Sequence, residues 1–195
     1  MRAIVTLFVL VSFSACQAIP TPTVRPDRFY QDWVLEQDLV YRIGTTSEEI
    51  VVPAGFVTDF ASIPAFARPA LSSTDLYSSA AVVHDFLYWT QSCSKQQADN
   101  IFLIAMQESD VGFFWRNVIY GAVRTPPSQA AWDRNRALRA QGLPKVFPSE
   151  FREEFTQLGA EEAQRVAKTK GVEDPPFDNA PSYCALGDTS DVPTG

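Results

Sequence analysis

Residues 80–89 read AAVVHDFLYW, and residues 94–102 read SKQQADNIF. Helix start signals upstream of the first run predict a helix from about Asp75 to Trp89. In the second run, Ser94 and Gln97 have the spacing of a capping box, which predicts a helix ending near Glu108. Two consecutive helices therefore carry the polar residues on which the functional interpretation depends.

Upstream of these helices, the sequence has strand character. Five apolar residues recur on alternate positions between residues 29 and 43, as expected for a half-buried strand: Trp33, Leu35, Leu39, Tyr41 and Ile43. A turn at residues 44–47 and a returning strand at residues 49–52 follow. We therefore expect a small antiparallel hairpin to open the domain.

Further helices are expected downstream. One spans residues 112–124 and ends ahead of Pro126 and Pro127. Another is capped by Ser128 and ends near residue 142, and a last one starts at Ser149 and breaks at Gly159. The predicted fold class is mainly α with a small N-terminal antiparallel β-hairpin (α+β), with a helical core around a His–Asp centre.

The N-terminus has the order of a secretory signal. Arg2 is followed by an apolar run over residues 4–11, which is too short to span a bilayer. Residues 13–16 read FSAC and resemble the lipobox of bacterial lipoproteins, in which the cysteine is lipidated and becomes the new N-terminus. That resemblance implies a signal segment over residues 1–16, lipid attachment at Cys16 and, because Gln17 follows, an outer-membrane location facing the periplasm. The alternative is an ordinary cleaved signal.

The remaining chain divides by composition. Residues 17–28 contain three prolines and predict an extended tether. Residues 29–141 are expected to form the globular domain and residues 142–171 a C-terminal helical extension. Prolines in residues 172–195 predict a loosely ordered tail.

Composition limits the function classes. The net charge is −7 and no basic run is present, which argues against a nucleic-acid partner. Only one histidine is present, His84, which disfavours zinc. Export would place Cys93 and Cys184 in an oxidising compartment, where they either pair or remain as two free thiols.

One constellation carries the candidate chemistry. His84 and Tyr88 lie four residues apart on one helix face, and Asp85 points to the adjacent face. Asp99 lies in an apolar stretch of the next helix and needs a hydrogen-bonded partner, for which His84 is suited. A buried Asp that holds one imidazole nitrogen fixes the tautomer and leaves the other nitrogen as a base.

Two resemblances extend this reading. The pattern of residues 52–64, His84-Asp85-Phe86-Leu87-Tyr88 and Ala98-Asp99-x-x-Phe102 resembles a phage and bacterial family of unknown function, which implies a phage-related origin. More distantly, the His-Asp-x-x-Tyr and Asp-x-x-Phe pattern is similar to the secreted phospholipase A₂ superfamily. This second resemblance implies His84 as base, Asp99 as its orienter, Tyr88 as a hydrogen-bonding member of the network and Asp85 as a ligand of Ca²⁺. The glycine-rich calcium loop of that family is absent here, and Asp59 is the candidate that adds a second carboxylate ligand.

Alternative assignments stay open for other residues. Ser62 is a candidate nucleophile with His84 and Asp99, although no Gly-x-Ser-x-Gly elbow surrounds it. The aromatic run at residues 113–115 either packs in the core or touches lipid.

Two functions from different classes follow. The first is a membrane-tethered envelope lipoprotein that acts as a binding or interference module, with the membrane and an envelope protein as partners. The second is a calcium-assisted hydrolase of phospholipid or another envelope ester. A cleft that opens onto His84 favours the hydrolase, whereas a His84 sealed beneath Tyr88 and Phe102 favours the binding module.

Overall fold

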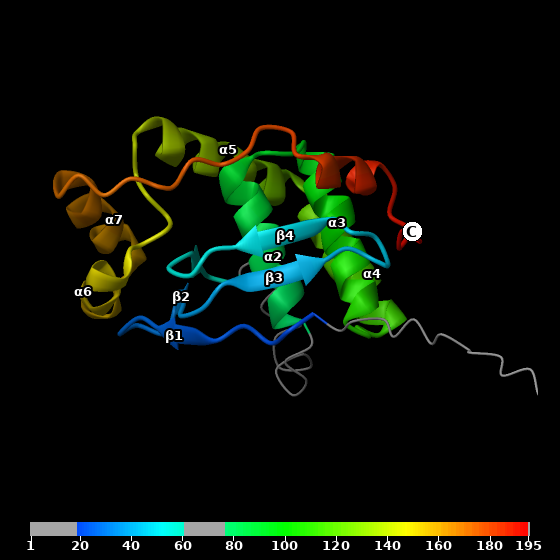
Figure 1. The fold of residues 1–195 in the computed structure, drawn as a ribbon, viewed down its shortest axis with the longest axis horizontal. Helices are drawn as coiled ribbons and strands as arrows, with labels where there is room; N and C mark the ends of the chain where they lie inside the picture. The colour runs from blue at the N-terminus through cyan, green and yellow to red at the C-terminus, as the bar shows by residue number, and fades with distance from the viewer. Residues whose placement is uncertain (1–18, 61–76, 195) are drawn as a thin grey trace, which may run out of the picture.

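The structure, a computed structural model, describes residues 19–60 and 77–194 (Figure 1). Helix α2 (Ser78–Thr90) runs through the middle of the domain, and all of its residues from Ser79 onward are buried. Helix α3 (Lys95–Glu108) packs beside α2, and its first turn is held by the capping box of Ser94 and Gln97. The mainly helical α+β fold is therefore confirmed.

Two more helices follow, and the second begins with two prolines. Helix α4 (Phe113–Val123) ends shortly before helix α5 (Pro126–Ala140), in which Pro126 occupies the first turn, where no intrahelical donor is needed. The cap predicted at Ser128 is wrong, because Thr125 precedes the helix and Ser128 lies inside it. Within the described ranges, none of the helices combines the length and apolarity needed to cross a bilayer.

The strands form two small antiparallel sheets. Strand β2 (Trp33–Leu35) lies between β1 (Val24–Pro26) and β5 (Val57–Thr58), while β3 (Leu39–Arg42) pairs with β4 (Glu49–Val52). The β3–β4 pair is the expected hairpin, with Leu39 opposite Val52 and Tyr41 opposite Ile50 on the buried face.

The single strand expected over residues 29–43 is wrong. The chain leaves the first sheet after Leu35 and enters the hairpin at Leu39, and between them the Asp38 carboxylate accepts a hydrogen bond from the Ala54 amide (2.7 Å). Val34 and Leu35 are consecutive and both fully buried, because β2 separates two apolar clusters. A strand that is covered on both faces does not alternate between apolar and polar residues. The alternation expected over residues 29–43 therefore does not hold for β2.

The second apolar cluster contains residues beyond position 141. It joins β2 and β5 to the 3-10 turn η1 (Ser149–Phe151) and helices α6 (Arg152–Leu158) and α7 (Ala160–Thr169). Phe147, Phe151 and Phe155 pack there against Val34 and Val57. The predicted break at Gly159 separates α6 from α7. The segment treated from sequence as an extension thus builds this second core together with β2 and β5.

Both ends of the described chain also differ from the sequence expectation. Within the expected tether, residues 24–26 form β1, and Arg25 makes an ion pair with Glu36 (2.7 Å). Within the expected loose tail, the 3-10 segment η2 (Ser182–Asp188) packs on α3. Asn100 Nδ2 donates to the Gly187 carbonyl (2.8 Å), so specific hydrogen bonds hold this proline-rich segment in place.

We expect Gly55→Ala to destabilise the fold by about 2–3 kcal/mol. Gly55 has φ +91°, and a Cβ at this position would lie 1.9 Å from the Phe147 carbonyl oxygen. The Phe147 amide donates to the Gly55 carbonyl (2.9 Å), which ties the first sheet to the second core. Urea unfolding measures the effect, with Gly142→Ala as a control that shares the positive φ but meets no atom within 4 Å. Equal losses in both variants would contradict a role for this close approach.

Candidate functional site

A buried hydrogen bond joins α2 to α3 at the centre of the domain. His84 Nε2 lies 3.0 Å from Asp99 Oδ1. Because the capping box fixes where α3 begins, Asp99 comes one turn into the helix and faces α2. A ring nitrogen that donates to the carboxylate carries a proton, so Asp99 selects the tautomer protonated on Nε2 whenever the ring is neutral. This arrangement is that of a base held in one tautomer.

The Asp99 carboxylate is shared among three donors. Besides His84, the Tyr88 hydroxyl donates to Oδ1 (2.6 Å) and Lys95 Nζ donates to Oδ2 (2.8 Å). Burial acts to raise the pKa of Asp99, but the hydrogen bond and charge of His84, together with Lys95 and Tyr88, outweigh it and lower the pKa. Asp99 is therefore an ionised orienting group. Burial and the Asp99 charge raise the pKa of Tyr88, which stays a neutral donor.

Aromatic rings enclose the imidazole. The His84 ring stacks on Phe102, with centroids 4.3 Å apart, and packs at a tilt against Tyr88 at 4.1 Å. Only 1% of His84 is exposed. Tyr88 also bonds to the Ser128 hydroxyl (2.7 Å), which brings α5 into the same network.

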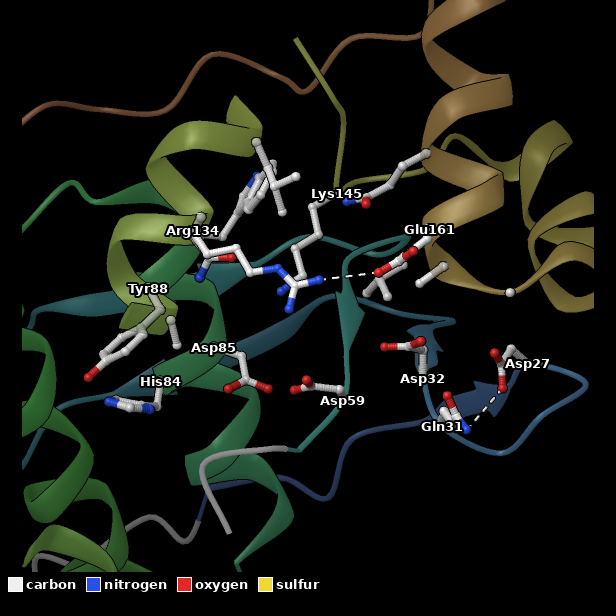
Figure 2. Close-up of a pocket in the computed structure, with 18 of the residues that line it drawn as sticks. Asp27, Gln31, Asp32, Asp59, His84, Asp85, Tyr88, Arg134, Lys145 and Glu161 are labelled. Carbon is white, nitrogen blue, oxygen red and sulfur yellow. Dashed lines mark hydrogen bonds and ion pairs between the residues drawn. The ribbon is translucent and has the colours of Figure 1, made fainter. Parts of the chain in front are cut away.

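A cleft of about 1020 Å³ lies beside this centre, with His84, Asp85 and Tyr88 on one wall (Figure 2). Other parts of its lining come from β5, α5, the loop between β1 and β2, and the start of α7. The ion pair of Arg134 on α5 with Glu161 on α7 (3.2 Å) connects two of its walls. The cleft therefore lies between the two apolar cores, and His84 contributes to its lining despite its low exposure.

Two carboxylates face each other across the floor of the cleft. Figure 2 shows Asp85 of α2 and Asp59, which follows β5, pointing toward one another. The Thr58 hydroxyl donates to Asp85 Oδ2 (2.5 Å). Burial, and next the charge of Asp59, raise the pKa of Asp85, while Lys145 and Thr58 act in the opposite direction. The pKa of Asp99, which bonds to His84, is thus lowered, whereas the pKa of Asp85, the residue that follows His84 in the sequence, is raised.

Lys145 and Asp32 line the cleft as well, and sequence reasoning missed both. The Lys145 ammonium lies over the rings of Phe56 (5.3 Å) and Trp89 (5.6 Å). Lys145 follows α5 in a stretch without periodicity, and Asp32 lies in a loop, so no motif marks either residue. Both residues reach the cleft only because segments that are far apart in the sequence come together in the fold.

We expect Asp32→Asn to make the protein more stable at neutral pH. Burial, followed by the charges of Asp59 and Asp27, raises the pKa of Asp32 from 3.8 to about 6. Because the folded protein holds this proton more tightly than the unfolded chain does, the protonated Asp32 carboxyl contributes stability. That contribution is complete below the unfolded-state pKa and is lost as pH rises through about 6. Because Asp32 is only partly buried, solvent screening reduces the expected gain of the variant to about 1–2 kcal/mol above about pH 7.

Urea unfolding at about pH 3 and about pH 8 measures this difference, which should vanish at the lower pH, where Asp32 is protonated in both states. Asp191→Asn is the matched control, because Asp191 is exposed and lies outside the cleft lining. If the variant gains the same free energy of unfolding at both pH values, the raised pKa of Asp32 is not the cause of the gain.

The described donors fall short of a calcium site. Calcium takes about six to eight oxygen ligands. Asp85 and Asp59 supply oxygens of the right kind, but among the described residues no group of three or more His, Cys, Asp or Glu side chains is placed to hold a metal ion. Binding of Ca²⁺ between Asp85 and Asp59 would therefore need further oxygen ligands beside these two carboxylates.

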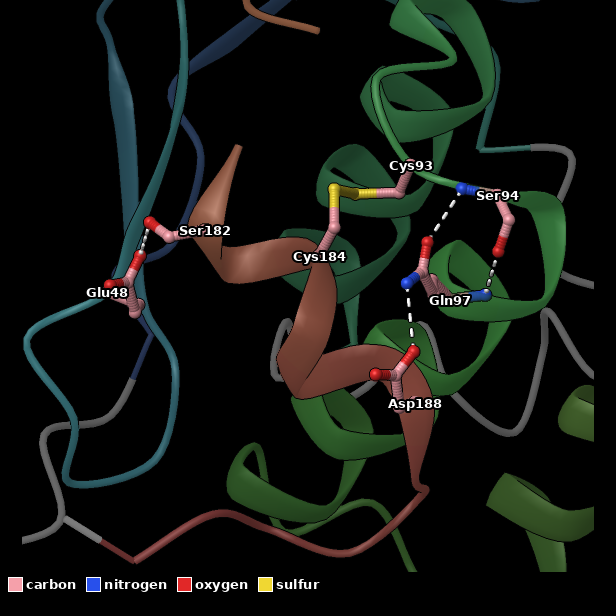
Figure 3. The surroundings of a disulfide bond; sticks show 7 residues. All are labelled: Glu48, Cys93, Ser94, Gln97, Ser182, Cys184 and Asp188. Atoms are coloured by element: carbon pink, nitrogen blue, oxygen red, sulfur yellow. Dashed lines mark hydrogen bonds between the residues drawn. A yellow bond between two sulfur atoms is a disulfide. The ribbon is translucent and has the colours of Figure 1, made fainter. Parts of the chain in front are cut away.

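Two of the three cysteines lie within the described residues. Cys93 and Cys184 form a disulfide, with Cα atoms 5.3 Å apart (Figure 3). Gln97 adds to the same junction by donating to Asp188 (2.9 Å), and Ser182 donates to Glu48 (2.6 Å). Cys16 and Ser62, with the whole signal segment, lie outside the described residues.

The fold and site define a helical α+β domain with a His–Asp pair beside an acidic cleft. Residues 33–123 match a family model described as "Protein of unknown function (DUF1353)". The match covers somewhat less than half of the chain and is consistent with the sequence resemblance to a family of unknown function. No curated protein and no solved structure matches the chain.

The matched span runs from β2 to the end of α4 and contains Asp59, His84, Asp85, Tyr88 and Asp99. Asp32, Ser128 and Lys145 lie outside it. The His–Asp centre thus lies within the matched span, whereas the cleft wall formed by α5 and α7 comes from the part of this chain that the family model does not cover.

Proposed function

We propose that the protein is an ester hydrolase of the bacterial envelope, anchored at the outer membrane through lipid on Cys16, in which His84 activates water. The observation that supports this function best is the 3.0 Å contact between His84 Nε2 and Asp99 Oδ1 in a wall of the cleft. A histidine that acts as a general base requires a carboxylate that holds one ring nitrogen and fixes the tautomer, and Asp99 has that place beside His84.

Each of the central residues has its own role in this reaction. His84 Nδ1 takes a proton from water as the water oxygen attacks the ester carbonyl, and then returns that proton to the departing alkoxide. Ionised Asp99 stabilises the imidazolium formed in between, and Tyr88 and Lys95 hold Asp99 in place. Lys145 is a cation in the lining of the cleft, and its charge suits the negative charge that develops on the carbonyl oxygen.

The substrate class follows from the anchor and from the phospholipase-like spacing of His84, Asp85, Tyr88 and Asp99. A lipid-anchored enzyme meets phospholipid at high local concentration, so a phospholipid or another envelope ester is the proposed substrate. Calcium, if bound, would be held by Asp85 and Asp59 and would polarise the carbonyl.

A binding or interference module is the second candidate, and the burial of His84 favours it. The imidazole is 1% exposed and packs against Phe102 and Tyr88, and Asp99 already accepts from three donors. In this alternative the network only stabilises the domain, and the acidic cleft or another surface holds an envelope protein or blocks an incoming phage.

Fatty-acid release from mixed phospholipid vesicles distinguishes the two candidates. The assay uses a soluble chain starting at Gln17, with calcium or with a chelator, and compares it with His84→Ala. Val51→Ala is the control, because Val51 lies on the exposed face of the hairpin outside the cleft lining. Release that disappears only in His84→Ala supports the hydrolase, and loss under the chelator adds the metal. No release from any form, with His84→Ala unfolding more easily, contradicts the hydrolase and favours the binding module.

A further inference from the structure

Two consecutive phenylalanines lie exposed at the start of α4. Phe113 is 73% exposed and Phe114 68% exposed. Phe114 packs edge-on against the half-buried Trp115 (5.3 Å), and the Arg116 guanidinium lies 5.3 Å from the centre of the Phe113 ring. We call Phe113 and Phe114 the aromatic tip. Adjacent exposed aromatic rings beside a cation are costly in water and are typical of a surface that contacts lipid headgroups and acyl chains.

The start of the described chain lies against the domain. Ile19 packs on the main core, and the Pro20 carbonyl accepts a hydrogen bond from Ser79 Oγ at the start of α2 (2.6 Å). Only three peptide steps separate Ile19 from Cys16. Three residues span about 10 Å at most. A lipid on Cys16 therefore places the part of the domain around Ile19 next to the bilayer.

The hydrogen bonds and ring contacts bring the aromatic tip to the same end of the molecule. The start of α2 faces the second half of α3, since Tyr77 contacts Phe102 (6.0 Å). Lys95, at the start of α3, bonds to the Val123 carbonyl at the end of α4 (2.7 Å), so α3 and α4 run in opposite directions. The first turn of α4 consequently lies at the end of the bundle where α2 begins and Pro20 is bound. In Figure 1, α4 and the point where the blue chain begins reach the same lower edge, opposite α5.

We propose that the aromatic tip inserts into the lipid bilayer beside the anchor, so that the domain lies on the membrane in one orientation. This inference rests on the lipid attachment at Cys16 that is part of the proposed function. With a net charge of −7, attraction to anionic lipid is not the driving force. Transfer of the two rings out of water is the driving force, with Arg116 placed to meet a phosphate.

The test measures where a tryptophan at the tip lies. The chain from Cys16 onward is coupled through its thiol to maleimide lipid in phosphatidylcholine–phosphatidylglycerol vesicles. The disulfide occupies the other two of the three cysteines, so the coupling site is unique. Phe114→Trp is compared with Ala140→Trp, an exposed position at the end of α5, in vesicles with and without brominated acyl chains. The emission of the parent chain coupled to the same vesicles, with its four native tryptophans, is subtracted.

A ring seated about 5–10 Å into the headgroup and acyl boundary lies within reach of acyl-chain bromine, so about half of the added emission of Phe114→Trp should be quenched. Ala140→Trp should keep its emission. Equal emission of Phe114→Trp in both vesicle types would overturn the proposal. An emission change that depends on protein concentration in the absence of lipid would also overturn it, because it would show that a second copy of the protein covers the aromatic tip. Because coupling is chemical, this result does not depend on lipidation in cells, and the absence of lipid on Cys16 in cell fractions would count separately against the proposed anchor.

Discussion

His84→Ala should lower kcat for ester hydrolysis by about 10²–10⁴-fold while leaving KM nearly unchanged. The imidazole acts on water in the transition state and contributes little to holding the substrate, so its loss appears in kcat. Asp99→Asn should cause a loss of similar size, because an amide that donates to Nε2 moves the proton to Nδ1 and removes the base. Initial rates over a range of ester concentrations measure both parameters.

Tyr88→Phe is the informative control for this prediction. It removes one of the donors to Asp99 but leaves the contacts of His84 (3.0 Å) and Lys95 (2.8 Å). We expect its kcat to fall by less than about tenfold. Circular dichroism and urea unfolding check that each variant is folded. If Tyr88→Phe loses as much activity as His84→Ala while both remain folded, the base is not His84.

Replacing Cys93 and Cys184 together with serine should lower the free energy of unfolding by about 4–5 kcal/mol. The disulfide joins residues 91 positions apart, so it removes much of the freedom of the unfolded chain. It also fixes η2 on α3, where Asn100 holds the Gly187 carbonyl and Gln97 holds Asp188. With the bridge gone, hydrogen bonds such as these, one buried and one to an exposed carboxylate, have to hold the C-terminal segment in place.

Urea unfolding of the chain from Gln17 measures this effect with and without a reducing agent. The parent protein should shift to the stability of the double variant when reduced, and the double variant should not respond. A difference below about 1 kcal/mol between parent and variant would show that the fold does not depend on this bridge.

The sequence predicts those parts of the fold and site that depend on local signals. The capping box at Ser94 set the start of α3, and the i, i+4 spacing of His84 and Tyr88 placed both on one helix face. Asp99 was assigned to His84 because a carboxylate in an apolar helix needs a partner, and the structure brings the two together. The break at Gly159 was also visible as a local signal.

The parts that the sequence did not predict depend on contacts between distant segments. Strand β1 forms because Arg25 pairs with Val34, and a proline-rich stretch gives no sign of that pairing. The C-terminal segment is ordered by α3, which lies about 90 residues earlier in the chain. Asp32 and Lys145 join the cleft from a loop and from the stretch after α5, and their role is set by which charges surround them.

Alkylation of the single histidine by an α-bromoketone tests most directly whether His84 is a base that can be reached from the cleft. The reagent reacts with a neutral imidazole nitrogen that carries a lone pair, and mass spectrometry of the digested protein locates the adduct. We predict one equivalent of adduct on His84 in the folded protein, formed much more slowly in Asp99→Asn. A folded protein that stays unmodified until it is denatured would show that His84 is sealed beneath Phe102 and Tyr88, and would contradict the hydrolase.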